Sequence, residues 1–518
     1  MKKSPIFLLL LALAHPSLAA GSDTGFSQKF GPRFQGAPTP ILPIIAPSRA
    51  LDILHRWNEI AINATGLDHT PVPPGDPRVF GEQLGPGRSS RAMAIVHIAM
   101  FDAMNAIYGG YRSYTGVRAG RGPISDAAAV AQAARDTLVA LFPSQIANFD
   151  TLLAEDLAGI TNATKKANGI RLGQQAAAAI LAMRVNDGSQ IPEPTGGVDY
   201  FPSDQPGHWR QDPISLIPLA LGAHWGQCIP FVINSTTQFR APPPPDMTSA
   251  AYTAAYNEVK NVGGDGVITP TQRTEEQTFI GIFWAYDGTP SLCAPPRLYN
   301  QITVNIADQQ RVHGIELARL LALVNVAMAD AAMTIWESKY YYDFWRPITG
   351  IRESDPGTGP TGLGDGNPDT VGDPTFTPLG APASNLVGPD FTPPFPAYPS
   401  GHAGFGARFF RPCAASTGRV RSRLPLSPMN LMARRATTMA PCVRIDRAAS
   451  PTCRKPRKKT AKAGFILAST GLSTRRKRLP WGGAWQTTSS STPLHPCKTD
   501  SDGFPGTCFA QSVLYELI

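Results

Sequence analysis

The sequence predicts an all-α, helical-bundle protein, and three observations support this fold class. Long stretches place apolar residues three and four positions apart, which is the spacing of an amphipathic helix. No stretch alternates polar and apolar residues for long enough to form a convincing β-sheet. Segments rich in glycine and proline separate the helical stretches. At 518 residues, the chain can form one large domain or two smaller ones.

The expected helices follow one another from residue 90 onward. The first is strongly apolar and spans 90–108, with Ser89 or Ser90 as a possible cap and two glycines after its end. The later helices are expected at 125–142, 146–158, 163–186, 248–262, 271–286 and, as a final set, 303–345. Long loops are expected at 189–245 and 353–399. The second of these is too long to be only a connection, so we expect it to shape a functional site.

The N-terminus has the pattern of a secretory signal peptide. A basic pair at residues 2–3 precedes an apolar run over 6–14, and small residues follow at 17–19. This pattern predicts cleavage near Ala19/Ala20 and a secreted or periplasmic protein. The apolar run is too short to span a bilayer, and no later stretch reaches about 18 uninterrupted apolar residues. We therefore expect no membrane span.

Residues 408–518 differ in composition from the rest of the chain. Of the 47 Lys/Arg and 38 Asp/Glu residues, 20 and 4 lie in this tail, so the chain before it has a net charge of −7. Five of the seven cysteines also lie in the tail, without the regular spacing of a disulfide framework or a zinc site. One explanation is a basic tail that binds nucleic acid or a membrane surface.

Two cations lie seven residues apart at the end of the 303–345 helices. Seven helical residues differ from two full turns by only about 20°, so Lys339 and Arg346 would share a face that Pro347 ends. Two cations on one face repel each other unless an anion lies between them. In the alternative interpretation, Lys339 pairs with Asp343 four residues later, and Arg346 is a solvated helix end.

A second pattern stands at the end of the long loop. Ser400 is a natural N-cap, and Gly401 exposes backbone N–H groups where a helix N-terminus favours an anion. His402 follows directly and is placed to move a proton at that anion. The alternative is an ordinary capped helix with an incidental histidine. His97, within an apolar stretch, is interpreted as a satisfied core residue.

Together, Lys339-x6-Arg346-Pro347 and Pro399-Ser400-Gly401-His402 resemble two of the three motifs of a known superfamily. This superfamily contains the vanadium-dependent haloperoxidases and the type 2 phosphatidic acid phosphatases. Further segments are similar to its chloroperoxidase branch, and they lie at 284–288, 295–300 and 391–398, with Trp336 three residues before the lysine. The resemblance covers roughly residues 50–407.

The resemblance implies a site for vanadate or phosphate. The residues that would hold the equatorial oxygens are Lys339, Arg346, Ser400 and Gly401. His402 would be the acid–base residue, and Lys339 would also polarise the peroxide. The residues that would line the halide side are Trp336, Pro393 and Phe395, while Asp287 would brace an arginine of the third motif.

Two activities are compatible with this resemblance. In a haloperoxidase, vanadate is the cofactor, and hydrogen peroxide oxidises a halide to hypohalous acid. In an acid phosphatase, the third-motif histidine attacks a phosphate ester and His402 protonates the leaving group. The chloroperoxidase-like aromatic residues favour the haloperoxidase. Neither activity requires a nucleic-acid partner, and we expect none.

The third motif, Ser-Arg followed by five residues and a histidine, is missing from 408–518. In the superfamily this histidine is the axial vanadate ligand, so the chain as written is expected to be impaired or catalytically inactive. A shifted reading frame of the back-translated tail permits Ala-Leu-Phe-Gln-Thr-Leu-Arg-Arg-Phe-Tyr-Gly from Ala407. The same frame permits Ser-Arg-Ile-Tyr-Leu-Gly-Ile-His within 451–471. We therefore hypothesise one frameshift near Ala407, which would leave apolar faces of the 303–345 helices uncovered.

The expected organisation has five parts. In order, they are a signal peptide, a Pro/Gly-rich arm, an N-terminal helical bundle, a truncated C-terminal bundle with the oxyanion site, and the frameshifted tail. Their boundaries are 1–19, 20–50, 51–300, 301–407 and 408–518.

Overall fold

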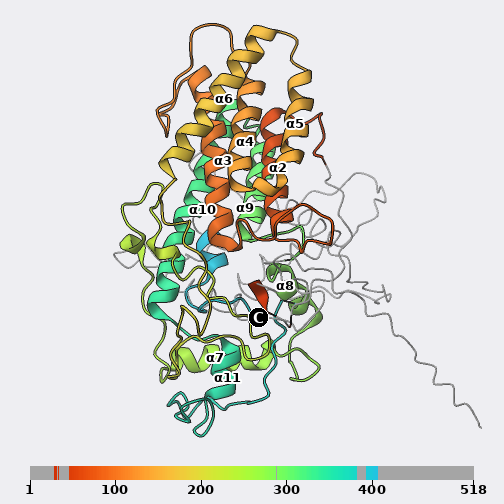
Figure 1. The fold of residues 1–518 in the computed structure, drawn as a ribbon. Coiled ribbons are helices and arrows are strands. Elements are labelled where there is room, and N and C mark those ends of the chain that lie inside the picture. The colour runs from red at the N-terminus through yellow and green to blue at the C-terminus, as the bar shows by residue number, and fades with distance from the viewer. Residues whose placement is uncertain (1–28, 32, 34–45, 287–288, 382–391, 407–518) are drawn as a thin grey trace, which may run out of the picture.

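The computed structural model describes residues 29–31, 33, 46–286, 289–381 and 392–406 (Figure 1). The predicted signal peptide, most of the arm, Asp287 and the tail from 407 onward lie outside these residues. Within the described ranges, α-helices form the regular structure, and β-pairing is limited to isolated bridges. The prediction of an all-α fold is therefore confirmed.

One half of the molecule is a helical bundle (Figure 1). Its helices are α2 (Ile53–Asp68), α3 (Gly85–Tyr108), α4 (Asp126–Leu141), η1 (Pro143–Gln145), α5 (Ile146–Ala158) and α6 (Ala163–Met183). Glycines permit close packing of α6 on α4. A Cβ atom at Gly169 would lie 2.4 Å from the Ser125 carbonyl oxygen, and one at Gly173 would lie 2.5 Å from that of Ala129. This interface therefore requires glycine at both positions.

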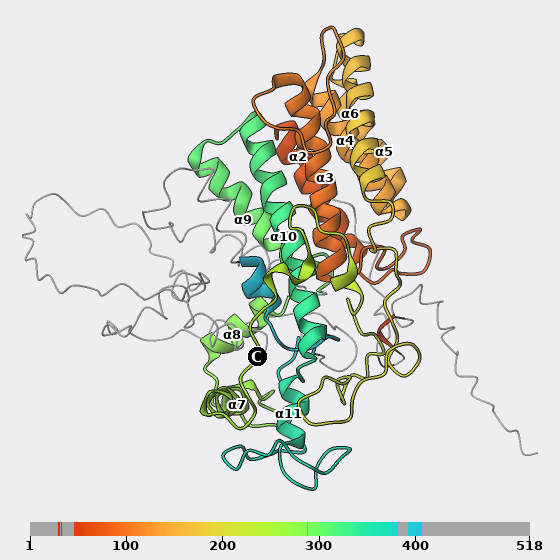
Figure 2. The ribbon, with the colours of Figure 1, turned by 90° about the vertical axis from the view of Figure 1, so that its left-hand side faces the viewer.

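Helix α10 (Gly314–Tyr342) connects this bundle to the other half. It follows α9 (Pro295–Gln310), packs on α3, and extends far beyond the bundle (Figures 1 and 2). In the described part of the chain, α10 alone has the length and hydropathy of a membrane span, but 83% of its most apolar window is buried within the protein. The expectation of an uncovered apolar face is therefore wrong for α10. Helix α10 contributes to both halves. The boundary at residue 300 between the two predicted bundles stays a prediction.

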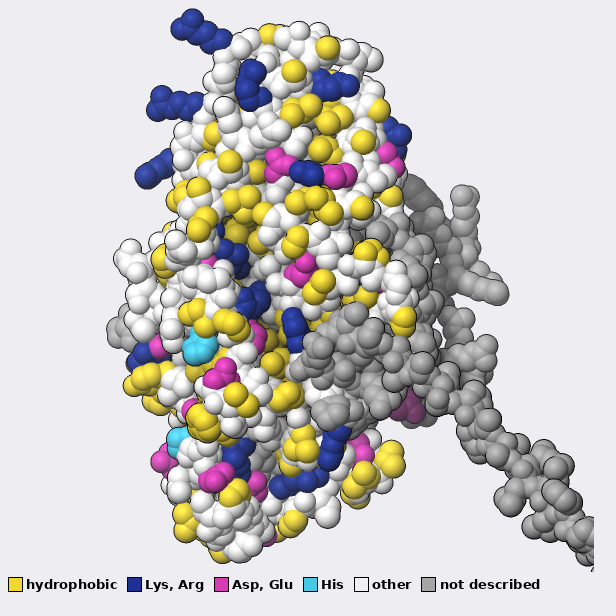
Figure 3. Space-filling view, viewed as in Figure 1, with side chains coloured by type: hydrophobic (Ala, Val, Ile, Leu, Met, Phe, Trp, Pro, Cys, Tyr) yellow, Lys and Arg dark blue, Asp and Glu magenta, His cyan; other side chains and the backbone are white. Residues whose placement is uncertain are grey.

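The second half consists of short helices and long loops (Figure 2). Its helices are η2 (Trp225–Gln227), η3 (Thr236–Phe239), α7 (Ala250–Gly263), α8 (Glu275–Trp284) and α11 (Pro347–Glu353). Helix α7 packs on α11 around a small aromatic core that includes Tyr256, Trp345 and Phe376. Helical residues 401–406 follow the long loop. On the face seen in Figure 3, acidic and basic side chains are interspersed.

The predicted helices are present in the structure, with differences at some of their ends. The stretch 146–158 coincides with α5, whereas α2 and α11 were not predicted. Helix α3 begins at Gly85 with a proline in its first turn and no side-chain cap, so the predicted cap at Ser89 or Ser90 is wrong. Helix α9 also begins at a proline, Pro295. Proline suits the first turn of a helix because its φ angle is already helical and its missing N–H group has no partner there.

His97 is a core residue of α3, as predicted. It is 1% exposed, and its Nδ1 and Nε2 atoms lie 2.7 and 2.9 Å from oxygen atoms of Met93 and Asn58. Burial lowers the pKa of His97 to about 4. A histidine that stays neutral and enclosed in this way supports packing rather than proton transfer.

A second histidine, His55, links the start of α2 to the end of α9. Its Nδ1 atom contacts the Asp52 carboxylate, and its Nε2 atom lies 2.9 Å from Asp308 Oδ1. The hydrogen bond with Asp52 raises the pKa of His55 above its ordinary value of 6.5, although burial opposes this effect. Both carboxylates are more than half exposed, so solvent screens the pair.

We expect His55→Ala to lower the free energy of unfolding by about 0.5–1 kcal/mol near pH 6. Because the pKa of His55 is raised in the folded state, this stabilisation is present below pH 6.5 and is lost as the pH rises through the folded-state pKa. Urea unfolding of both proteins between about pH 6 and pH 9 measures the difference. A difference that grows with pH would contradict the assignment.

Candidate oxyanion site

Lys339 lies in the last turn of α10 and is fully buried. Its Nζ atom donates hydrogen bonds to the carbonyl oxygens of Pro396 (2.9 Å) and Ala397 (3.0 Å). The same atom lies 5.8 and 5.1 Å from the ring centroids of Trp336 and Phe395, within cation–π range. A buried cation is costly unless polar groups surround it. The carbonyl oxygens therefore hold the ammonium group in a defined position.

Arg346 contacts the same segment. It is 2% exposed, and its Nε atom donates a hydrogen bond to the Phe395 carbonyl oxygen at 2.7 Å. Its guanidinium carbon lies 4.8 Å from the Phe395 ring centroid. Together, Lys339 and Arg346 donate to three consecutive residues, 395–397. Two buried positive charges thus converge on one short segment.

The two cations do not share one helix, so that prediction is wrong. Helix α10 ends at Tyr342, and Asp343 adopts a left-handed conformation with a φ of 50°. Arg346 is the N-cap of α11, and Pro347 begins that helix instead of ending α10. The carboxylate of Asp343 contacts His208 and Tyr200, so the alternative pairing with Lys339 is also wrong.

Ser400 precedes helical residues 401–406, as the sequence predicts. Its side-chain oxygen accepts a hydrogen bond from the N–H group of Ala403 (3.2 Å), and its carbonyl oxygen accepts one from Gly404 (3.2 Å). Gly404 allows close approach to α10, because a Cβ atom there would lie 2.2 Å from Ile335 Cδ1. Ser400 and Gly401 are thereby held against the helix that carries Lys339.

His402 packs against aromatic residues and a tyrosine hydroxyl. Its ring is nearly perpendicular to those of Trp284 and Tyr286, with centroids 5.8 and 6.2 Å away. Its carbonyl oxygen accepts a hydrogen bond from the Tyr299 hydroxyl at 2.8 Å. The end of α8, the residues that follow it and the second turn of α9 therefore orient His402. The sequence indicated these aromatic residues only as part of the resemblance, without this role.

The residues predicted for the halide side lie around the lysine. Trp336 and Phe395 are buried, and their ring centroids are 5.0 Å apart. Pro393 lies two residues before Phe395 on the loop, and its carbonyl oxygen accepts a hydrogen bond from the N–H group of Phe395 at 2.8 Å. Asp287 lies outside the described residues.

A turn at Leu221 and Gly222, which the sequence did not single out, supports this arrangement. The Leu221 carbonyl oxygen accepts hydrogen bonds from Trp336 Nε1 and the Tyr340 hydroxyl, both at 3.0 Å. The Leu221 N–H group donates to Pro394 at 2.9 Å. The turn therefore connects α10 to the loop that receives the two cations. The sequence gives no indication that a single glycine within a long loop makes such a contact.

The donor set suits a tetrahedral oxyanion. A guanidinium group offers a planar fork of N–H donors, an ammonium group offers a compact charge, and a serine hydroxyl can add a further donor. Among the residues that the structure describes, no cluster of three His, Cys, Asp or Glu side chains could hold a metal cation. Donors of these kinds are the ones that proteins use to bind oxyanions.

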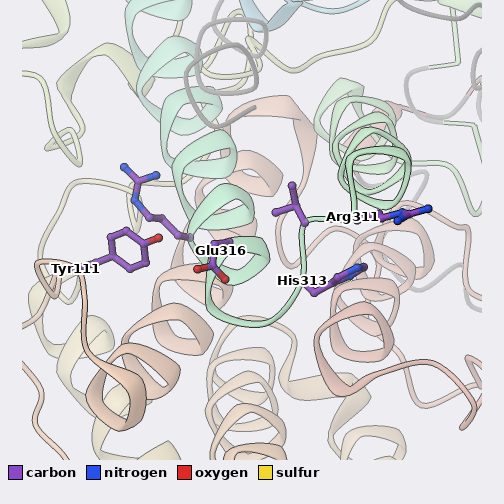
Figure 4. A pocket seen from close by; sticks show the side chains of 6 residues that line it. Tyr111, Arg311, His313 and Glu316 are labelled. Carbon is purple, nitrogen blue, oxygen red and sulfur yellow. The ribbon is translucent and has the colours of Figure 1, made fainter. Parts of the chain in front are cut away.

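A separate pocket lies at the opposite end of α10, where α9 and α10 meet (Figure 4). It has a volume of about 380 Å³ and is lined by Tyr111, Arg311, Val312, His313, Glu316 and Arg319. Figure 4 shows Tyr111 on one side, Arg311 and His313 on the other, and Glu316 between them. Because the basic groups do not converge on one point, we assign no ligand to this pocket.

Comparison with known proteins adds independent information. The family model of the VCPO second helical-bundle domain matches residues 319–447. The vanadium chloroperoxidase of Curvularia inaequalis is 32% identical over 418 residues, which cover 68% of this chain and 64% of that protein. The chain therefore spans slightly less than two thirds of this relative. The first bacterial vanadium-dependent iodoperoxidase of known structure has a similar fold, with a TM-score of 0.53, 20% identity, and coverage of 70% of this chain and 80% of that chain.

The contact between Gly222 and Trp336 can be tested with a matched control. Gly222 has a φ of 81°, and a Cβ atom there would lie 2.2 Å from Trp336 Cδ1. Gly197 has a φ of 79°, but no atom lies within 4 Å of its Cβ position. Thermal unfolding should show a loss of about 1 kcal/mol for Gly197→Ala from backbone strain alone. Gly222→Ala should lose about 2–4 kcal/mol, because the clash adds to that strain. Equal losses would contradict the tight contact.

Proposed function

Because the chain belongs to the vanadium haloperoxidase family, we propose that its oxyanion site binds vanadate and serves the oxidation of halide by hydrogen peroxide to hypohalous acid. The observation that carries this proposal is the convergence of two buried cations, Lys339 and Arg346, on residues 395–397. Two buried positive charges destabilise a fold unless negative charge compensates them. An oxyanion bound beside Lys339 and Arg346 would accept charge-assisted hydrogen bonds from both side chains.

Each residue of the site has a distinct part in this proposal. Arg346 and Lys339 hold the anion's oxygen atoms, with Ser400 and the backbone of Gly401 as further donors. When bound, vanadate supplies a Lewis-acid centre that activates peroxide toward halide. His402, oriented by its aromatic neighbours, moves protons. The buried rings beside Lys339 keep water away from the ammonium group and strengthen its electrostatic effect.

The histidine of the third motif is missing from this sequence. The family model matches residues 319–447, and this range contains His402 but no later histidine. The next histidine, His495, is not preceded by the Ser-Arg pattern. The residues present would therefore donate hydrogen bonds to the oxygen atoms of a bound vanadate, but the histidine of the third motif is missing. We propose a frameshift near Ala407 as the cause of this gap, although the match to the family model continues to residue 447. We expect the chain with the given sequence to bind vanadate weakly and to oxidise halide poorly.

The coding DNA and a restored protein test this proposal together. The shifted frame must be free of stop codons between Ala407 and Gly471. We expect the restored chain to bind vanadate at least tenfold more tightly than the chain with the given sequence. Once the restored histidine holds the anion, the hydrogen bonds from the other site residues cost less entropy. It should also oxidise halide in a peroxide-dependent assay, and Lys339→Ala should abolish this activity.

The outcomes of this experiment separate the alternatives. Equal activity of the written and restored chains would refute the frameshift. Hydrolysis of a phosphate ester by the restored chain, without oxidation of any halide, would identify an acid phosphatase instead. Inactivity of the restored chain in both assays would favour a catalytically inactive protein.

We also propose that the protein is exported, on the basis of its N-terminal sequence pattern. N-terminal sequencing of the protein isolated from the medium or the periplasm should show a start at Ala20 or Gly21. An intact N-terminus on protein that remains in the cytoplasm would contradict export.

A further inference from the structure

We propose that His208 and Asp343 form a positioning pair that sets the placement of Arg346 relative to Lys339, and thereby the affinity of the site for its oxyanion. This inference rests on the proposed oxyanion site but concerns residues outside it. Asp343 lies between Lys339 and Arg346 at a position that the motif does not specify, and His208 lies more than a hundred residues before the lysine.

The placement of the two cations depends on a three-residue corner. Residues 343–345 separate the end of α10 from Arg346, the N-cap of α11. Lys339 is held by a regular helix, but the position of Arg346 depends on how the chain turns at this corner. A change in the backbone at Asp343 would therefore move one cation relative to the other.

Backbone hydrogen bonds hold the corner between two other segments. On one side, Trp209 N–H donates to Asp343 (2.7 Å), and Trp345 N–H donates to Gly207 (2.9 Å). On the other side, Ala397 N–H donates to Phe344 at 2.9 Å. The corner thus lies between the loop around His208 and the segment that receives both cations. A movement of the corner would therefore move this segment of the site as well.

Side chains lock the corner to the loop. The Asp343 carboxylate lies 2.9 Å from His208 Nδ1 and 3.4 Å from the Tyr200 hydroxyl, which donates to it. Burial raises the pKa of Asp343, while the hydrogen bond with His208 acts in the opposite direction and favours the ionised carboxylate. The rings of Tyr200, Trp209 and Tyr340 pack edge to face, with centroids 5.7–6.2 Å apart. This cluster joins the loop to the last turns of α10.

Because Asp343 has a left-handed conformation, a glycine variant can show whether its side chain or its backbone conformation is important. Its φ of 50° is left-handed, which aspartate and asparagine tolerate and which glycine adopts without strain. If the corner required only this conformation, Asp343→Gly would be neutral or stabilising. If the contact with His208 positions Arg346, the glycine variant would lose affinity although its backbone is relaxed.

The test is calorimetric titration of the full-length chain with orthovanadate and, separately, with inorganic phosphate. We expect His208→Ala and Asp343→Gly to weaken binding about 3- to 10-fold, the effect of losing one hydrogen bond. Asp343→Asn keeps the turn and one acceptor oxygen, so it should bind within about twofold of the unaltered chain. His55→Ala removes a remote histidine–aspartate contact and should leave the affinity unchanged.

Thermal unfolding of each variant confirms that it is folded at the titration temperature. Binding by both His208→Ala and Asp343→Gly with the affinity of the unaltered chain, with binding lost in Lys339→Ala, would overturn the positioning role alone. Equal weakening by His55→Ala would also overturn it, because a general loss of stability would then explain the effect. No binding of either anion by the unaltered chain and by the frame-restored chain would refute the oxyanion site together with this inference.

Discussion

The burial of two positive charges against one short segment is the constraint on which this structure depends. Lys339 and Arg346 are almost completely withdrawn from solvent, and both donate to the carbonyl oxygens of residues 395–397. Carbonyl dipoles and the Phe395 ring reduce the cost of this burial. For the oxyanion that we propose as the ligand, binding and local stability are expected to be coupled at this site.

The rest of the fold meets this constraint by holding three distant segments together. Helix α10 is anchored on α3 in the bundle and brings Lys339 into the other half. The turn at Leu221 and the corner at Asp343 connect the same loop to α10 and α11. The helical bundle therefore acts as a rigid support for irregular segments. Irregular backbone supplies most of the contacts in the site, as is common for functional sites on helical scaffolds.

Family membership and the individual chain lead to different conclusions about activity. The residues that we propose as oxyanion donors, the proposed acid–base residue His402 and the surrounding aromatic residues all lie before residue 407. The third motif, Ser-Arg followed by five residues and a histidine, is missing from 408–518. The body also carries a net charge of −7, so attraction of an anion depends on the local field of buried cations rather than on overall charge.

The sequence alone determined the all-α class, most helix positions and the residues of the two motifs, because helical periodicity and short motifs are local properties. It did not determine that Lys339 and Arg346 lie on separate helices, since a left-handed residue at Asp343 is not evident from residue type. Nor did it indicate His208 or Gly222, whose contacts join residues more than a hundred positions apart. The tertiary structure determines these features, because packing decides which loop residues come into contact. No periodic pattern in the sequence indicates these contacts.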